Sequence, residues 1–264
     1  MKKQILLTFD LEEFDLPLEF GYEISDEDQI NISNNGLQRI LKLLSKYNVP
    51  ATFFTTSFYA NRNKEIIKNL SENHEIASHS KDHSDFRETD PLDSKVEIER
   101  ITGKKVFGFR MPHFKEIDLS LIKGAGYSYD SSINPTLIPG RYNNLLVQRE
   151  MHYDKRSNLI EIPVSVSPII RFPLFWISFK NIPLPVYLYM CKRSILKDSY
   201  LHLYFHSWEF ADLKPFKIPW YIKTLSGNSL SERFEKLIVE LRKTWDFSTL
   251  SGFLDTTGYL RFFS

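Results

Sequence analysis

Short apolar runs alternate with amphipathic segments along the first half of the chain, and this alternation most limits the possible folds. Runs typical of buried strands lie at residues 4–9, 51–56, 74–78, 105–109 and 127–130. Between them, apolar residues at helical spacing predict helices at 34–47, 62–72, 91–102 and 117–123. Strands that alternate with helices favour a parallel sheet with helices outside it, and 264 residues suit a single α/β barrel.

This alternation changes after residue 140. The second half is expected to hold strands at 145–149, 159–164 and 201–205 and helices at 184–195 and 229–243. Residues 168–190 contain four prolines and many aromatic residues. Because proline interrupts helices, this segment is expected to form an irregular cover over one face. We therefore expect one domain, 1–264, with a Pro/aromatic-rich covering insertion near 141–195.

Polar residues stand at the carboxyl ends of five predicted strands. They are Asp10, His79, Arg110, Asp130 and His206. In a parallel barrel these strand ends converge on one face, where catalytic groups collect. The sequence therefore predicts a functional site there.

Two histidines and two acids near these strand ends are candidates for a metal site. His79 and His83 are four residues apart, a spacing at which two imidazoles can bind one ion, and a carboxylate would complete the ligand set. Asp10 and Glu12 could divide the work, one binding metal and the other taking a proton from metal-bound water. The alternatives are two ordinary surface histidines and a solvated acidic loop.

Arg110 and His206 add a positive charge and a titratable group. A buried arginine needs an anionic partner, and Asp10 is the obvious one, although a structural salt bridge at the barrel rim explains Arg110 equally well. With an ordinary pKa of about 6.5, His206 suits a general acid for an amine leaving group. The alternative is a hydrogen-bonded core histidine, which is also how we interpret His74, His113, His152 and His202.

The order of these segments resembles the five motifs of the polysaccharide deacetylases, the NodB-homology group or carbohydrate esterase family 4. The matching segments are Thr8-Phe9-Asp10-Leu11-Glu12, His79-Ser80-Lys81-Asp82-His83, Arg110-Met111-Pro112-His113-Phe114, Asp130-Ser131-Ser132 and Leu201 to His206. The first motif departs from the family pattern, because Leu11 separates two acids that are usually adjacent. The dipeptide Trp208-Glu209 after the last histidine resembles a bacterial subgroup associated with surface glycans.

The resemblance implies a fold and a set of roles. The fold would be a distorted, incomplete (β/α) barrel of about seven parallel strands with outer helices. Asp10 would be the base, His206 the acid and Arg110 the residue that orients Asp10. Glu12, His79 and His83 would bind a divalent metal, zinc or else cobalt, nickel or manganese. The substrate would be contacted by Met111, Pro112, Phe114, Asp130 and Trp208.

The activity implied is hydrolysis of an N-acetyl group on an amino sugar, in a surface glycan or in its lipid- or nucleotide-linked precursor. Two alternatives are a C–N hydrolase acting on a non-sugar amide and a catalytically inactive glycan-binding protein. The net charge of +1 gives no reason to expect nucleic acid as a partner.

Two further features of the sequence concern the cellular location of the protein. The first apolar run ends at Asp10, too early for a signal peptide, and no apolar run is long enough to span a membrane, so a cytoplasmic protein is expected. The 168–190 segment could contact a membrane or a lipid-linked sugar, or another copy of the chain. We favour its being part of the core, because large exposed apolar patches are uncommon.

Overall fold

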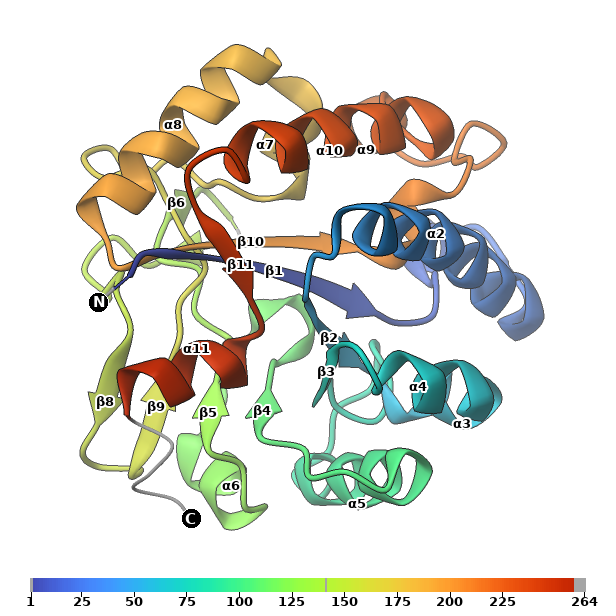
Figure 1. Cartoon of the computed structure of the whole chain (residues 1–264). Coiled ribbons are helices and arrows are strands. Elements are labelled where there is room, and N and C mark those ends of the chain that lie inside the picture. Colours follow the sequence, from blue (N-terminus) through green and yellow to red (C-terminus); the bar gives the residue numbers. More distant parts are fainter. Residues whose placement is uncertain (1, 141, 259–264) are drawn as a thin grey trace.

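The computed structural model describes residues 2–140 and 142–258, which form one curled, mostly parallel sheet surrounded by helices (Figure 1). In spatial order the strands are β10 (Tyr200–His206), β1 (Gln4–Leu11), β2 (Thr52–Thr55), β3 (Glu75–Ser78), β4 (Gly108–Phe109), β5 (Tyr129–Asp130), β9 (Leu159–Glu161) and β8 (His152–Asp154). Successive strands from β10 to β9 are parallel, and β8 is antiparallel to β9. The short β11 (Asp246–Ser248) pairs with the start of β1. The predicted parallel α/β fold is confirmed.

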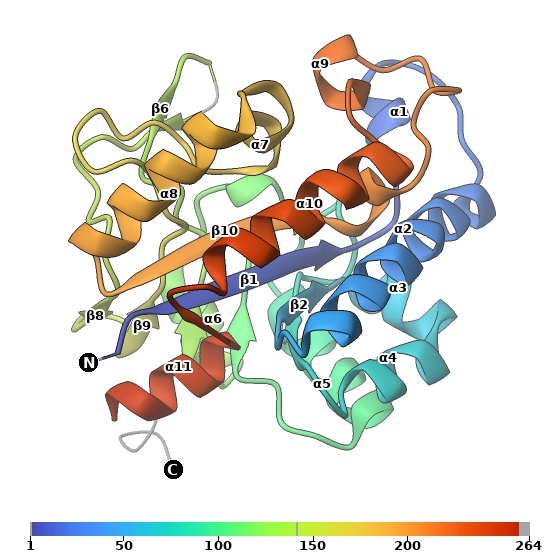
Figure 2. The same ribbon diagram turned by 45° about the horizontal axis from the view of Figure 1, so that its top comes forward.

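Helices cover the outside of this sheet (Figure 2). They are α2 (Asp26–Tyr47), α3 (Ser57–Arg62), α4 (Lys64–Leu70), α5 (Asp90–Thr102), α6 (Leu119–Gly124), α8 (Leu184–Lys197), α10 (Gly227–Leu241) and α11 (Leu250–Thr257). α5 ends as predicted at Gly103, which has a positive φ of 68°. α2 begins well before residue 34, because Ser25 caps it by accepting a hydrogen bond from the Asp28 amide.

The long helix α2 supports the strand ends directly. Its Ser33 hydroxyl donates to the Glu12 carbonyl. A Cβ on its Gly36 would lie 1.9 Å from the Ser207 carbonyl oxygen, so only glycine allows the helix to approach this closely. Ser207 opens the short helix η2 (Ser207–Phe210) that follows β10. The close approach therefore fixes the chain on either side of the predicted site.

The segment after residue 140 departs from the prediction in two places, because residues 176–181 of the expected irregular cover form a regular helix and the strand expected at 145–149 is missing. Residues 145–149 form a turn instead of a strand, and Leu146 is fully exposed, because β8 and β9 already complete this edge of the sheet. Further on, α7 (Trp176–Asn181) and α8 contact β10. Trp176 and Phe179 are buried, as the core interpretation of 168–190 requires, whereas Ile169 and Ile170 are exposed.

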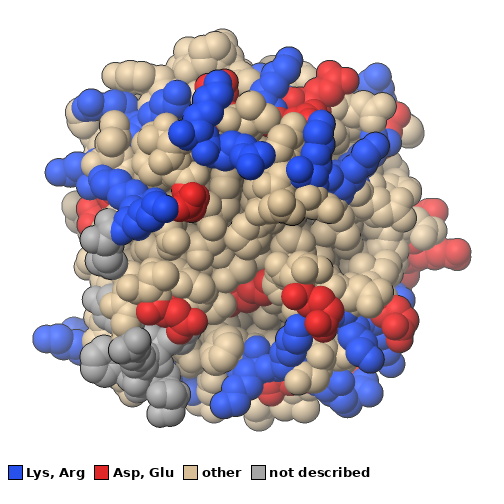
Figure 3. Space-filling model, viewed as in Figure 1, with Lys and Arg blue, Asp and Glu red and all other residues tan. Residues whose placement is uncertain are grey.

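Small elements border the strand ends. They are α1 (Leu16–Glu19), the hairpin β6 (Leu137–Ile138) and β7 (Tyr142–Asn143), η1 (Pro112–Phe114) and α9 (Trp220–Lys223). On the outer surface, Lys and Arg side chains gather over α8 and α10 (Figure 3), so the small net charge is unevenly distributed. Among residues 2–140 and 142–258, no helix is long and apolar enough to cross a membrane.

Candidate metal centre

The carboxyl ends of the parallel strands bring the predicted polar residues together. Asp10 and His206 are directly paired in the register of β1 and β10. His79 follows β3, and Arg110 follows β4, the next strand in the sheet. Residues from opposite ends of the chain therefore meet because the first and last long strands are neighbours.

Glu12, His79 and His83 form a compact, buried triangle. The Glu12 Oε2 atom lies 3.1 Å from His79 Nε2 and 3.4 Å from His83 Nε2. One potential ligand atom from each residue lies within 4.8 Å of the other two. A carboxylate and two imidazoles make a donor set that suits zinc and other first-row divalent ions.

Hydrogen bonds orient each member of the triangle. The Nδ1 of His79 lies 2.9 Å from the Arg110 carbonyl oxygen, and the Nδ1 of His83 lies 3.0 Å from Asp15 Oδ1. Both imidazoles can thus donate through Nδ1 and present Nε2 to an ion. Glu12 Oε1 accepts a hydrogen bond from Trp208 at 3.0 Å, whereas its buried Oε2 has no hydrogen-bond partner among the described residues. These residues fit a bound divalent cation.

The pKa values of the residues in the triangle also favour a bound cation. Burial raises the pKa of Glu12, but the neighbouring His83, His79 and His206 outweigh it and hold this pKa well below its usual range. Burial lowers the pKa of His83, but Glu12 and Asp15 raise it to about 10. The carboxylates thus stabilise positive charge within the triangle, and a divalent cation would supply that charge in place of protons.

Asp10 is held beside the triangle by Arg110. The fully buried guanidinium donates to Asp10 Oδ1 at 2.6 Å, and its other nitrogens contact Thr8, Ser131 and His202. The free Asp10 Oδ2 lies 4.0 Å from His79 Nε2 and 3.8 Å from His206 Nε2. His202 is a buried, hydrogen-bonded histidine, as predicted.

His206 is supported by two residues for which the sequence analysis predicted no role in the site. Glu209 accepts from the His206 amide at 2.7 Å and lies 3.1 Å from its Nδ1. Lys180 of α7 lies 3.2 Å from Glu209, and both side chains are fully buried. Glu209 is detectable in sequence as an acid three residues after the histidine. Lys180 carries no such signal, because only the fold brings α7 to this point.

A small cavity of about 90 Å³ opens above the triangle. Of the predicted substrate contacts, Phe114 and Trp208 line it, whereas Met111 and Pro112 are buried outside its lining. Asp130 lines a second, larger cavity next to it. Aromatic walls that the sequence analysis missed come from α7, β10 and α9, namely Trp176, Tyr204 and Tyr221.

The rings around His206 restrict its position. Its imidazole stacks on Trp208 with ring centroids 4.8 Å apart and meets Trp176 edge-on at 5.1 Å. Burial lowers the pKa of His206, but Glu209, Glu12 and Asp10 outweigh it and raise the pKa above its usual value. The site therefore holds a carboxylate, Asp10, and an imidazole whose protonated form is favoured, His206, next to each other beside the triangle.

Comparison of the sequence with known proteins agrees with this geometry. Residues 1–120 match the family described as polysaccharide deacetylase. A peptidoglycan deacetylase from Helicobacter pylori is 32% identical over 108 residues, which are 37% of this chain and 37% of that protein. A peptidoglycan-N-acetylglucosamine deacetylase from Bacillus cereus is 37% identical over 70 residues, which are 26% of this chain and 32% of that protein. The matches span about a third of these relatives.

Solved structures share the fold over nearly the whole chain. One from Mycobacterium smegmatis, provisionally described as a polysaccharide deacetylase, has a TM-score of 0.65 at 17% identity and covers 98% of this chain and 91% of its own. A family 4 acetyl xylan esterase from Clostridium thermocellum, in complex with cobalt, has a TM-score of 0.51 at 15% identity, covering 97% and 92%. A CE4 family pseudoenzyme from Bacillus anthracis has a TM-score of 0.53 at 17% identity and covers 95% of this chain and 64% of its own. The predicted incomplete barrel is confirmed.

Proposed function

We propose that the chain is a polysaccharide deacetylase, the family that its residues 1–120 match, and that it removes the N-acetyl group from an amino sugar of a surface glycan or its precursor. The observation that carries this proposal is the buried triangle of Glu12, His79 and His83, flanked by Asp10 and His206. A base, an acid and a ligand set for a Lewis acid are the parts that amide hydrolysis requires.

We propose that the metal is zinc and that Glu12, His79 and His83 would hold it. The bound ion would polarise the acetyl carbonyl and lower the pKa of a water molecule. Asp10 then takes the proton from the attacking water through its free Oδ2. Arg110 holds the other oxygen of Asp10, so that only Oδ2 faces the site. An amide N–H of the Arg110 segment would stabilise the oxyanion.

His206 completes the reaction by protonating the departing amine. Glu209 raises its pKa, which favours the protonated imidazole, and Glu209 and the stacked Trp208 fix its orientation. Trp176 and Phe114 line the cavity and exclude bulk water from the acetyl group. Acetate and a free amino sugar leave the site.

Acetate release from chitooligosaccharides by the zinc-loaded protein tests this proposal. Asp10→Asn is expected to lower turnover by about 10²–10⁴-fold while bound metal, measured by mass spectrometry, stays the same. The matched control is Asp93→Asn, on the exposed face of α5, which should keep wild-type turnover.

The possible outcomes separate the alternatives. Near wild-type turnover in Asp10→Asn would refute the role of Asp10 as the base. Bound metal without acetate release from any amino sugar would favour a C–N hydrolase with a non-sugar substrate. Failure to bind any divalent metal would favour an inactive glycan-binding protein.

A further inference from the structure

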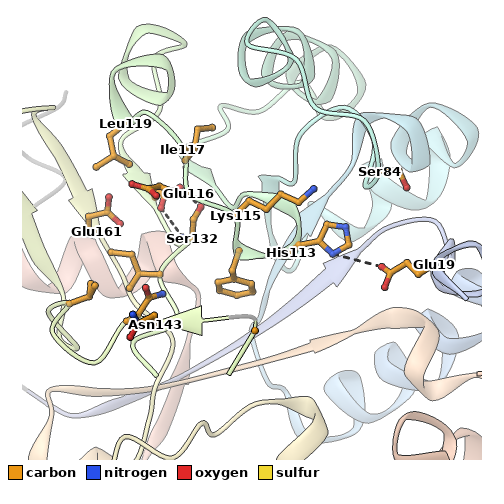
Figure 4. A pocket seen from close by; sticks show the side chains of 16 residues that line it. Glu19, Ser84, His113, Lys115, Glu116, Ile117, Leu119, Ser132, Asn143 and Glu161 are labelled. Atoms are coloured by element: carbon orange, nitrogen blue, oxygen red, sulfur yellow. Dashed lines mark hydrogen bonds and ion pairs between the residues drawn. The ribbon is translucent and has the colours of Figure 1, made fainter. Parts of the chain in front are cut away.

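A second cavity, of about 920 Å³, adjoins the one above the metal triangle (Figure 4). The two cavities share Glu19, His113 and Phe114 in their walls. The volume of the second cavity lies within the range that small-molecule sites occupy. A substrate whose acetyl group sits at the triangle would therefore extend past His113 and Phe114 into this space.

Two buried carboxyl groups face this second cavity. Asp130 on β5 and Glu161 on β9 are direct neighbours in the parallel register, so their side chains lie on the same face of the sheet. They are 1% and 2% exposed, and both line the cavity. The close-up in Figure 4 labels Glu161 and Ser132 among the side chains that line this cavity.

The two carboxyl groups differ in their hydrogen bonds. Both oxygens of Asp130 accept from Ser132, one from its amide at 2.7 Å and one from its hydroxyl at 2.6 Å. The Glu161 carboxyl group hydrogen-bonds to Asp130 through the proton that the pair shares, and its buried Oε2 has no further partner within the part of the chain that the structure describes. A buried carboxyl oxygen without a hydrogen bond destabilises the folded protein. A ligand that donates a hydrogen bond to it would therefore gain binding free energy.

The cavity as a whole attracts positive charge. Its walls carry the carboxyl groups of Glu19, Glu116, Asp130 and Glu161 against the ammonium group of Lys115. Burial and the neighbouring Asp130 raise the pKa of Glu161 to about 10, and burial raises that of Asp130 to about 6. At neutral pH the pair therefore holds one proton and one negative charge.

We propose that this cavity is a subsite for the ammonium group of a free amino sugar, bound by Glu161 and Asp130. This inference rests on the proposed deacetylase function, and it names the substrate class as a glycan that already contains an unacetylated amino sugar beside the reacting one. An ammonium group supplies both the donor that Glu161 Oε2 lacks and the charge that the carboxyl pair lacks. Phosphate or other anions would be repelled by the same walls.

Calorimetric titration of the full zinc-loaded chain tests the subsite with ligands that carry no acetyl group. We expect a glucosamine tetramer to bind about tenfold tighter than the uncharged cellotetraose. The double variant Asp130→Asn/Glu161→Gln removes the single negative charge of the pair and should abolish this preference, whereas Glu65→Gln, which removes one negative charge from the exposed face of α4, should keep it. Equal affinity for the two tetramers, or an unchanged preference in the double variant, would overturn the proposal.

Asp130→Asn alone provides a second variant if the double variant does not fold, because it keeps an acceptor for the Ser132 amide and is expected to weaken glucosamine binding in the same way. Acetate release from chitooligosaccharides separates the two proposals. Release without any preference for glucosamine over glucose would overturn the subsite and leave the deacetylase function standing. Preferential binding without release from acetylated or mixed oligomers would support the subsite and refute the deacetylase function.

Discussion

In the metal centre each buried carboxyl group faces a cationic or donating partner, whereas in the adjacent cavity two carboxyl groups face each other. Glu12 lies among His79, His83 and the Trp208 indole. Asp130 has as its register neighbour another acid, Glu161. Both sets stand at the carboxyl ends of strands in one sheet, so the difference comes from the neighbouring strands. The same residue type is thereby held ionised in one place and shares a proton in the other.

Replacing Arg110, whose positive charge lies beside Asp10, should have the largest effect on stability. Arg110→Met leaves the Asp10 carboxylate buried and unpaired, and we expect a loss of about 3–5 kcal/mol in the free energy of unfolding. Urea denaturation at pH 7 measures it. The double variant Asp10→Asn/Arg110→Met should recover part of the loss, and a loss of less than about 1 kcal/mol would show that Arg110 is not needed to balance this charge.

Removing the charge of Glu12 tests the paired carboxylate in the metal-free protein. Its lowered pKa contributes stability that is present above pH 4.5 and lost as pH falls, and the raised pKa of His83 contributes stability that is present below pH 6.5 and lost as pH rises through about 10. At pH 6, where both contributions are present, Glu12→Gln should lower stability by about 1–3 kcal/mol. Unfolding in the presence of a chelator measures this loss. A variant as stable as wild type would contradict it.

Replacing the titratable carboxyl group of Glu161 should have a smaller effect on stability, of opposite sign. Because its pKa is raised, Glu161 costs the folded protein no stability below pH 4.5 and costs progressively more as pH rises from there to about 10. Glu161→Gln should therefore be more stable than wild type at pH 8, by on the order of 1–2 kcal/mol, and nearly equal to it at pH 4. Thermal unfolding at the two pH values measures the change. An equal shift at both pH values would mean that the proton shared with Asp130 is not its cause.

Most of the fold could be predicted from local patterns. The strands from 4–9 to 127–130 and the helix that ends at Gly103 have clear apolar spacing and stop signals, and the structure contains them. The false strand at 145–149 has the apolar composition of a strand, but the sheet edge is already taken by β8. Composition alone does not say which apolar run reaches the edge, because pairing depends on distant segments.

The sequence by itself determined the chemical groups of the metal triangle and their local spacing. His79 and His83 lie on one loop, and Glu12 follows the end of the strand that carries Asp10, so short stretches of chain set these positions. Only the tertiary structure decided which groups meet across long separations: Lys180 behind Glu209, Arg110 against Asp10, and Glu161 beside Asp130. The physical reason is that parallel pairing places side chains from distant strands within contact, and no local pattern encodes that pairing.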